Sequence, residues 1–592
     1  MSSSSSLSLQ SSSTSSSGIS FQGITSGLQT SQLVQAEITQ ASGPLNELKA
    51  EQTANTSRST ALTALGSLMT TLSSSIATLN SSGLTARTVT STDPNNAYIT
   101  ATASGGASGS YTMQVIKTAT AAEISPTLSG GAPTNLSVAT ANSPVFNDTS
   151  GNESGSATFA LQDTNGNTQS ITLTGTNNTL QGLANAINAK QTADPNVANS
   201  VGLGIQATVV NTGSGTNPYE LILTSTTTGS GKAGSNIGIA ETTTGGALNT
   251  LGIPAGSVST TTSGGTTTSS ITGGLNSSAQ PGQNAVFTLD GVQLTRSSNT
   301  VSDAVNGVTF NLVQGGQTGT TTLTVTPDAT TATADMNTVL NNYNSLIQAY
   351  NTDSAQSGPL SGDFATQGLI SQISQSLTGR VGGLSTSATY NSASSLGLST
   401  NEDGTLSLDT SKFQTAFQAN PTAALNVFAT SGTSTNASVS LAVAGPKTAT
   451  GKIGFNITSY SANGNVAGTL TAPDGTQYNL TGSNGVLQGA QGTPLDGLYL
   501  GVTGVGSGTL TLSRGVGQAV EDTITHLTAY GTGSLAQMQK SITSQNTELA
   551  TQIASQQQML NTMQTSLENK YSAMEATLSQ LQAAGNSINS LS

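Results

Sequence analysis

The stretch LTALGSLMTTLSSSIATL, residues 62–79, decides how this chain begins to fold. Its apolar residues recur at alternating steps of three and four, which places them on one face of an α-helix. A second stripe of the same kind begins at Leu535 and continues almost to the last residue. Between the two stripes, glycine turns divide a Gly-, Ser- and Thr-rich middle into short alternating runs. The sequence therefore predicts coiled-coil helices at the two ends, paired with each other, and a β-rich middle.

We interpret the two stripes as candidate assembly seams, because one chain offers few partners for stripes of this length. A helix over residues 535–591 would be about 85 Å long at a rise of about 1.5 Å per residue. Its apolar spacing changes once, between Leu549 and Ile553, and such a stutter straightens the supercoil locally. The alternative is that the stripes form an intramolecular core only.

The candidate seam residues fall into two groups. The N-terminal seam consists of Ile24, Leu28, Leu33, Val34, Leu62, Leu65, Met69, Leu72, Ile76 and Leu79. The C-terminal seam consists of Leu535, Ile542, Leu549, Ile553, Leu560, Met563, Leu567, Met574, Leu578 and Leu581.

The composition restricts the class of protein. Hydrophobic residues make up 34% of the 592 residues and charged residues 7%, which favours several domains with small cores. A formal net charge of -13 opposes the basic surface expected of a nucleic-acid-binding protein. The absence of cysteine excludes disulfides and thiolate metal sites. We expect no membrane insertion, because no apolar window reaches the length of about eighteen residues that a spanning helix needs. We also expect no Sec-type signal, because the N-terminus has neither a positive charge nor an apolar core.

Changes of pattern along the chain predict an α+β multidomain protein: paired terminal coiled-coil helices, a mixed helix/sheet core domain and inserted β-rich domains. The predicted segments are a disordered Ser-rich leader (1–17), an N-terminal helical segment (18–55), the core domain (56–88 with 285–430), a first inserted β-rich domain (89–125 with 250–284), a second inserted α+β domain (126–249), an additional β-rich domain (431–516) and a C-terminal coiled-coil helix (517–592).

Turn and cap signals predict several local elements. Asn-Gly at 165–166 and Asp-Gly at 290–291 each lie between alternating runs, which is typical of β-hairpins. The Gly, Ser and Thr run at 256–274 is interpreted as a loop or linker. Helices are expected from about Asp335 and from Asp363, whose carboxylate suits an N-cap.

Some short patterns resemble ligand sites, and each has a simpler interpretation. The sequence GSGK at 229–232 resembles the end of a phosphate-binding loop but lacks the Ser or Thr that should follow the lysine, so we prefer a turn. Asp163 begins an Asp- and Asn-rich turn that could suggest calcium, yet the other EF-hand ligands are missing. His526 is the only histidine, which excludes a multi-histidine metal site within one chain. Glu402 and Asp403 could form a catalytic pair, but turn and capping chemistry explains them better. We expect no enzyme activity, no catalytic or metal-binding residue and no cofactor.

Several ordered blocks carry a resemblance to a known family. They are ITSGL at 24–28, LQGLANAINA at 180–189 in a predicted helix, residues 287–312, GPL at 358–360 followed by Gly362-Asp363, LGL at 396–398 running into DGTL at 403–406, residues 571–581, and Gly585-Asn586. Each block is weak alone, but their order and spacing together are specific. Apart from the Ser-rich leader, the chain resembles the flagellar filament cap proteins, also called hook-associated protein 2.

The resemblance implies a structural function outside the cell. Such proteins leave through the flagellar type III export channel, with an export chaperone before secretion, and form a small ring, a pentamer or a similar number, at the distal tip of the flagellum. The terminal helices act as legs on the newest flagellin subunits, the inserted domains form a plate, and flagellin folds and polymerises beneath it without leaking. The alternatives are another axial component, such as a hook-filament junction protein, or a secreted adhesin.

Overall fold

The computed structural model describes residues 30–93, 95–105, 108–126, 136–146, 156–175, 177–192, 202–231, 236–242, 251–253, 255–263, 266–273 and 280–589. Two compact units are present. The first joins the two ends of the chain, up to Asn80 and from Thr333 onward, and the second comprises Ser81–Ala332. The fold is mixed helix and sheet, with helices at the ends and β-rich domains between them, as the sequence predicts.

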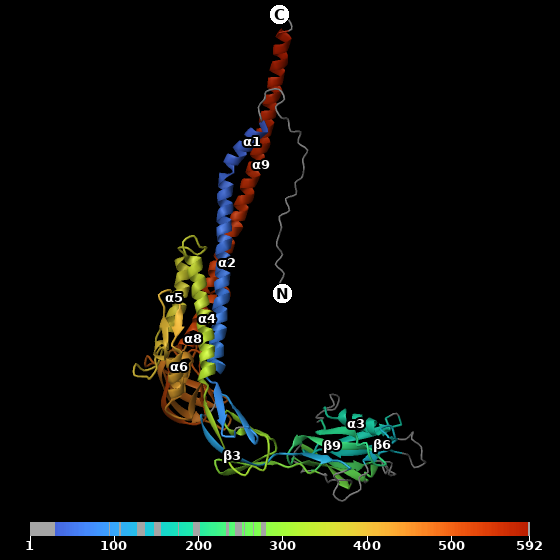
Figure 1. Ribbon diagram of the computed structural model, residues 1–592. Coiled ribbons are helices and arrows are strands. Elements are labelled where there is room, and N and C mark those ends of the chain that lie inside the picture. Colours follow the sequence, from blue (N-terminus) through green and yellow to red (C-terminus); the bar gives the residue numbers. More distant parts are fainter. Residues whose placement is uncertain are drawn as a thin grey trace. The chain divides into compact units, whose positions relative to one another are not determined.

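Three helices near the chain ends form the long part of the first unit. They are α1 (Thr30–Ala41), α2 (Gly43–Thr78) and α9 (Ser534–Asn589), and α1 and α2 lie along α9 (Figure 1). A π-helical turn (Leu79–Gly83) continues α2. Pro44 lies in the first turn of α2, where its missing N–H costs nothing.

The helix over Gly43–Ser81 is long and apolar enough to cross a membrane by length and composition alone, and 33% of its most apolar window is buried. Its most apolar residues pack against other helices of the first unit, so we interpret it as a packed helix. Many of its Thr and Ser hydroxyls, such as that of Thr63, donate to the carbonyl oxygen four residues earlier, which satisfies them on the exposed face.

Shorter helices complete the helical part of the first unit. They are α4 (Ala329–Ser354), α5 (Phe364–Thr378), α6 (Thr410–Ala419), α7 (Pro421–Phe428) and α8 (Val516–Thr528), with a small hairpin of β18 (Leu398–Thr400) and β19 (Leu406–Leu408). The predicted cap is confirmed, because the Asp363 carboxylate accepts the backbone N–H groups of Ala365 and Thr366. The helix expected from Asp335 begins six residues earlier, because Asp328 caps it by accepting the N–H groups of Thr330 and Thr331.

A β-sandwich occupies the part of the first unit between α7 and α8. One sheet has the strand order β20-β27-β22-β23-β24 and the other β21-β26-β25. The strands are β20 (Ser431–Ser434), β21 (Val439–Ala444), β22 (Gly451–Tyr460), β23 (Val466–Thr471), β24 (Gln477–Gly482), β25 (Val486–Gln488), β26 (Leu498–Val502) and β27 (Gly506–Ser513). Alternate residues, such as Ile453 and Phe455 on β22 with Leu500 on β26, meet in one buried core.

The second unit contains a sheet made from two distant parts of the sequence. Its order is β1-β17-β3-β13-β14, beside a smaller sheet β15-β16-β2. The strands are β1 (Arg87–Ser91), β2 (Ile99–Ala103), β3 (Gly109–Lys117), β13 (Ala285–Leu289), β14 (Val292–Arg296), β15 (Thr300–Val305), β16 (Val308–Leu312) and β17 (Thr321–Pro327). The Asp290-Gly291 hairpin is confirmed, and both residues have the positive φ that such a two-residue loop requires.

This pairing corrects the predicted domain division, which placed residues 285–327 in a core domain with 330–430. Phe287 lies opposite Val115 and Leu323 opposite Tyr111, so these strands share a sheet with β3 in the second unit. Cross-strand pairing between residues that are 172 and 212 positions apart leaves no local signal in the sequence. The other domain limits stay a prediction.

The rest of the second unit is an α+β arrangement around its own core. Its elements are β4 (Ala121–Ile124), β5 (Ser137–Val138), β6 (Ser156–Gln162), β7 (Thr168–Thr174), α3 (Leu180–Asn188), β8 (Ile205–Asn211), β9 (Tyr219–Thr228), β10 (Gly238–Glu241), β11 (Gly256–Ser263) and β12 (Thr266–Gly273). The predicted hairpin of β6 and β7 is confirmed, with Phe159 opposite Ile171.

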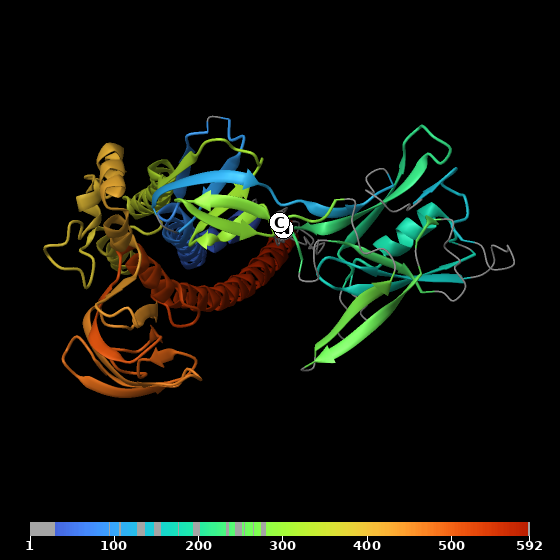
Figure 2. The same ribbon diagram turned by 90° about the horizontal axis from the view of Figure 1, so that it is seen from below.

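The prediction of a linker at 256–274 is wrong, because β11 and β12 pair as a regular antiparallel hairpin, the long green ribbon in Figure 2. Val258 lies opposite Ile271, and both pack with Ala160 and Ala240 of the strands β6 and β10. Threonine favours strands as well as polar loops, so the composition alone did not distinguish a ribbon from a linker.

Candidate assembly surface

The terminal helices of the chain form an antiparallel pair. Gln539 Nε2 donates to Thr63 Oγ1 at 3.3 Å, and the Tyr571 hydroxyl donates to the Glu37 carboxylate at 2.9 Å. The residue numbers of α9 therefore increase in the direction in which those of α1 and α2 decrease. A Cβ at Gly66 would lie 3.0 Å from Cδ2 of Leu535, so glycine permits the close approach of α2 and α9. The pairing of the two ends predicted from their stripes is thus formed within one chain.

The inner part of both seams is buried inside this chain. The N-terminal seam residues Leu62, Leu65, Met69 and Leu72 are 0% exposed, and Ile76 and Leu79 are also buried. On α9 the buried members are Leu535, Ile542 and Leu549. The expectation that one chain offers few partners is therefore wrong for this part, because α8 and α9 together cover the apolar face of α2. These side chains are core residues of the folded chain.

The next part of the C-terminal seam is closed by the start of α2. Ile553 and Leu560 pack with Leu45, and Ala41 and Leu48 adjoin this small cluster. On α1, Val34 is buried whereas Leu33 is 40% exposed. The predicted seam residues Ile24 and Leu28 lie outside the described residues.

Beyond Leu560 most apolar side chains of α9 are exposed, whereas Leu567 and Leu578 are half-buried. Leu581 is 63% exposed, and Ile588, one heptad further, is 67% exposed. We call this face the open stripe; it consists of Met563, Leu567, Met574, Leu578, Leu581 and Ile588. Single exposed apolar residues are common, but a set at heptad spacing on one helix is an apolar face available to a partner. The assembly role of these residues stays a prediction.

Two polar contacts fix the helices that carry the seams, and the sequence stripes gave no sign of either. Arg58 of α2 donates to Asp363 at the start of α5 at 2.8 Å, and the carboxylate side chain is 5% exposed. Burial alone would raise the pKa of Asp363, but hydrogen bonds from Arg58 and Thr366 outweigh it and lower the pKa. The hydrogen bond from Tyr571 to Glu37 raises the pKa of Tyr571, as do burial and the charge of Glu37.

The patterns that resembled ligand sites are engaged in turns. The Asp163 carboxylate accepts the backbone N–H groups of Asn165, Asn167 and Gly204 and the side-chain amide of Asn167. Within the described residues, no group of three or more His, Cys, Asp or Glu side chains could hold a metal ion.

The other candidate positions also take part in turns or lie at a helix end. Gly229 has a φ of 88° directly after β9, and the N–H of Ser230 donates to Asn284 Oδ1 at 2.7 Å; Lys232 lies outside the described residues. Asp403 accepts the backbone N–H and the hydroxyl of Thr405, and these bonds lower its pKa. His526 is exposed in the last turn of α8.

Two family models match the chain. The model described as the flagellar hook-associated protein 2 C-terminus covers residues 282–583, and the corresponding N-terminus model covers residues 26–122. The first of these alone spans about half of the chain.

Individual relatives and solved structures are similar over parts of the chain. Flagellar hook-associated protein 2 of Campylobacter jejuni is 34% identical over 158 residues, which is 24% of this chain and 24% of that protein. B-type flagellar hook-associated protein 2 of Pseudomonas aeruginosa is 27% identical over 351 residues, which is 56% of this chain and 64% of that protein. The chain thus spans less than two thirds of the length of these relatives. The crystal structure of the flagellar cap protein FliD D1-D2-D3 domains from Escherichia coli has 24% identity and a TM-score of 0.46, covering 62% of this chain and 89% of that chain. On the family models, this chain belongs to the flagellar hook-associated protein 2 family.

Proposed function

We propose that this protein caps the distal tip of the bacterial flagellar filament. It forms a small ring there with copies of itself, a pentamer or a similar number, and prevents flagellin from leaking while promoting its folding and polymerisation. It reaches this place through flagellar type III export, held before secretion by an export chaperone. Its function is structural, and no cofactor takes part.

The open stripe is the observation that supports this proposal most directly. An apolar face on the last turns of a long helix is costly to leave in water, and burial of each leucine or isoleucine contributes about 1.5–3 kcal/mol. The inner seams are already closed by the chain itself, so the open stripe is the part of the predicted seams that can still accept copies of this chain or flagellin subunits. We propose the exposed members of the stripe, rather than Leu62 to Leu79, as the assembly residues.

A deletion strain tests the capping role. Cells lacking the protein should release unpolymerised flagellin into the medium and carry short filaments, and the full-length gene should restore both. Filaments of normal length without released flagellin would overturn the proposal, and a defect limited to surface attachment would favour an adhesin.

Complementation with two matched variants tests the stripe. Leu581→Ser with Ile588→Ser removes two exposed apolar side chains from the open stripe and should leave flagellin in the medium. Val443→Ser with Val505→Ser removes two apolar side chains of similar exposure from the sandwich and should complement fully. Full complementation by both variants would show that the open stripe is not an assembly surface.

A further inference from the structure

Arg514 lies at the corner where the 431–513 sandwich returns to the helices. It follows the last residue of β27, Ser513, and precedes the start of α8 at Val516. Its backbone N–H donates to the carbonyl oxygen of Gly382 at 2.9 Å, and its side chain is 12% exposed. A mostly buried guanidinium needs several acceptors, because it cannot lose its charge.

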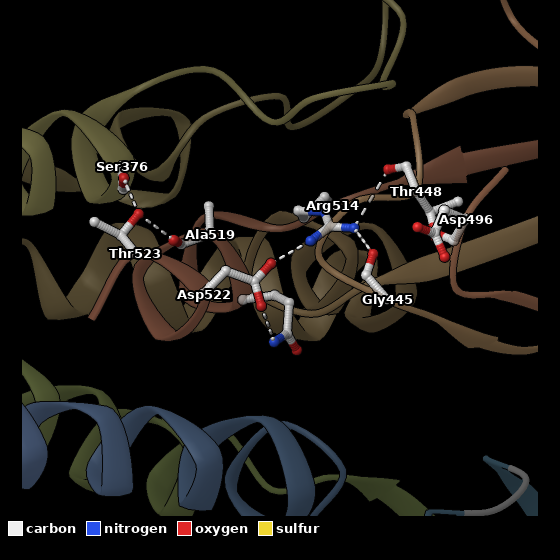
Figure 3. A network of polar contacts seen from close by, with 9 residues as sticks. Ser376, Gly445, Thr448, Asp496, Arg514, Ala519, Asp522 and Thr523 are labelled. Carbon is white, nitrogen blue, oxygen red and sulfur yellow. Dashed lines mark hydrogen bonds and ion pairs between the residues drawn. The ribbon is translucent and has the colours of Figure 1, made fainter. Parts of the chain in front are cut away.

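The guanidinium reaches both sides of this corner (Figure 3). Towards the helices it donates to Asp522 of α8, whose other carboxylate oxygen accepts the Gln518 amide at 3.2 Å. Towards the sandwich it donates to the carbonyl oxygen of Gly445 and, at 3.4 Å, to that of Thr448. The Arg514 side chain therefore joins α8 to a turn of the sandwich whose residues lie 69 and 66 positions before Arg514 in the sequence.

The turn that receives Arg514 is a fixed part of the sandwich. The N–H of Gly445 donates to the carbonyl oxygen of Gly497 at 2.9 Å. The hydroxyl of Thr448, a residue that is 3% exposed, donates to the carbonyl oxygen of Asp496 at 2.8 Å. The carbonyl groups that Arg514 contacts thus move with the strands β21 and β26.

The helical side of the contact is also fixed. Val520 and Ile524 of α8 are buried, and the hydroxyls of Thr523 and Ser376 lie 3.0 Å apart, which joins α8 to α5. A Cβ at Gly515 would lie 2.2 Å from the carbonyl carbon of Phe428, so the chain passes tightly over the end of α7. Arg514 therefore connects two bodies that are each rigid by themselves.

The backbone connections alone do not set the angle between these bodies. The chain enters the sandwich at Ser431 and leaves it at Ser513, and these two residues are paired, with their hydroxyls 2.7 Å apart. Two adjacent connections alone would leave a hinge; a third contact is made by the loop at Gly382 and Gly383, where a Cβ at Gly383 would lie 2.1 Å from the carbonyl oxygen of Leu512. Apolar packing does not close the space beside these connections, because a hollow of about 540 Å³ lies there, lined by Pro446 and Lys447 of the sandwich and by α5 and α8 residues that include Gln372, Thr523 and His526.

We propose that Arg514 is a positioning residue that latches the 431–513 sandwich to α8 and holds it in one orientation on the helices. The latch consists of Arg514, Asp522 and the carbonyl groups of Gly445 and Thr448. The sandwich is then a rigid projection of the helical part, and a load on it is transmitted to α8 and α5. This role does not depend on the capping function proposed above.

Distance measurements between spin labels test the latch in the full chain. The protein has no cysteine, so Val443→Cys on the sandwich and Phe364→Cys at the start of α5, both exposed, can be labelled without side reactions. With Arg514 present we expect one narrow distance distribution. Arg514→Gln should broaden the distance distribution at least twofold. Arg514→Lys should restore the narrow distribution only in part, because a single ammonium group does not match the two-sided geometry of guanidinium. Arg296→Gln, which removes a half-buried arginine paired with Asp303 in the second unit, is the matched control and should leave the distribution narrow.

Thermal unfolding of the same variants separates positioning from stability. The sandwich core is untouched by Arg514→Gln, so its unfolding transition should stay in place while the distance distribution broadens. An unchanged distribution in Arg514→Gln would overturn the proposal, as would a lowered transition with the distribution still narrow. If Arg514→Gln does not fold, Asp522→Asn replaces it, because this variant weakens the latch from the α8 side. An unchanged distance distribution in Asp522→Asn, or a lowered transition with a narrow distribution, would equally overturn the proposal.

Discussion

Two leucines on α9 provide a matched test of where the seam is closed and where it is open. Leu560 and Leu581 are the same residue type on the same helix, three heptads apart, and their exposures are 7% and 63%. Truncating each to alanine in the full chain removes the same atoms from a closed and from an open position. Any difference between Leu560→Ala and Leu581→Ala therefore reports the packing around the side chain.

The structure sets the expected magnitudes. Buried leucine-to-alanine changes cost about 2–5 kcal/mol, and Leu560, with only the cluster around Leu45 and Ile553 as neighbours, should lie near the lower end, at about 2 kcal/mol. Leu581 has little contact to lose, so its truncation should cost less than about 0.5 kcal/mol. At about 1.4 kcal/mol per tenfold change, these values correspond to about thirtyfold and less than about threefold.

Hydrogen exchange is the suitable assay, because it reports local opening of one helix in a protein of several domains. Amide exchange in the part of α9 around residues 545–565 should accelerate about thirtyfold in Leu560→Ala and stay within about threefold of the parent in Leu581→Ala. Equal acceleration by both variants would refute the division of the seam, as would a larger effect of Leu581→Ala.

Two further predictions concern carboxylates of the helical part. Asp363→Ala should lower the free energy of unfolding at pH 7 by about 1–2 kcal/mol, because it removes an N-cap and the partner of Arg58; urea denaturation with Arg296→Gln as a surface control measures this. Because the pKa of Asp363 is lowered in the fold, its contribution is present above the unfolded value of about 3.9 and is lost as the pH falls, so the variant and the parent should converge towards pH 3, and a constant difference would contradict the assignment. Burial, together with the charge of Asp522, raises the pKa of Glu521, so its contribution is present below the unfolded value of about 4.3 and is lost as the pH rises through the folded value. Glu521→Gln should therefore have a higher melting temperature than the parent at pH 8, and this difference should be smaller at pH 5. A variant that melts below the parent at pH 8 would show that the charged form is stabilised.

The local elements were predictable where the signal is short in range. The Asp290-Gly291 hairpin follows from the need for positive φ at both turn residues, and the Asp363 cap follows from the unpaired N–H groups at a helix start. The stripe from Leu535 lies on α9, which begins at Ser534, but the single helix predicted over 517–592 is wrong, because a turn at 529–533 separates α8 from α9. In each case the residues that decide the conformation are neighbours in the chain.

Pairings between distant residues were not predictable in the same way. The sheet that joins β3 to β13 and β17 moved residues 285–327 out of the domain predicted for them, and the β11–β12 ribbon replaced a predicted linker. Gly, Ser and Thr occur in both loops and strands, so only a facing apolar pair such as Val258 and Ile271 distinguishes the two.

The sequence by itself determined that the two ends are amphipathic helices, that the middle is β-rich and that the chain resembles the cap family, because periodicity, turn residues and ordered motifs are properties of the linear chain. Only the tertiary structure decided which seam residues are already covered. A heptad stripe gives the same signal at Leu65 and at Leu581, and burial depends on whether another helix of the chain lies opposite. For the same reason, the link from Arg514 to Asp522 and Gly445 became visible only when the sandwich was folded against α8.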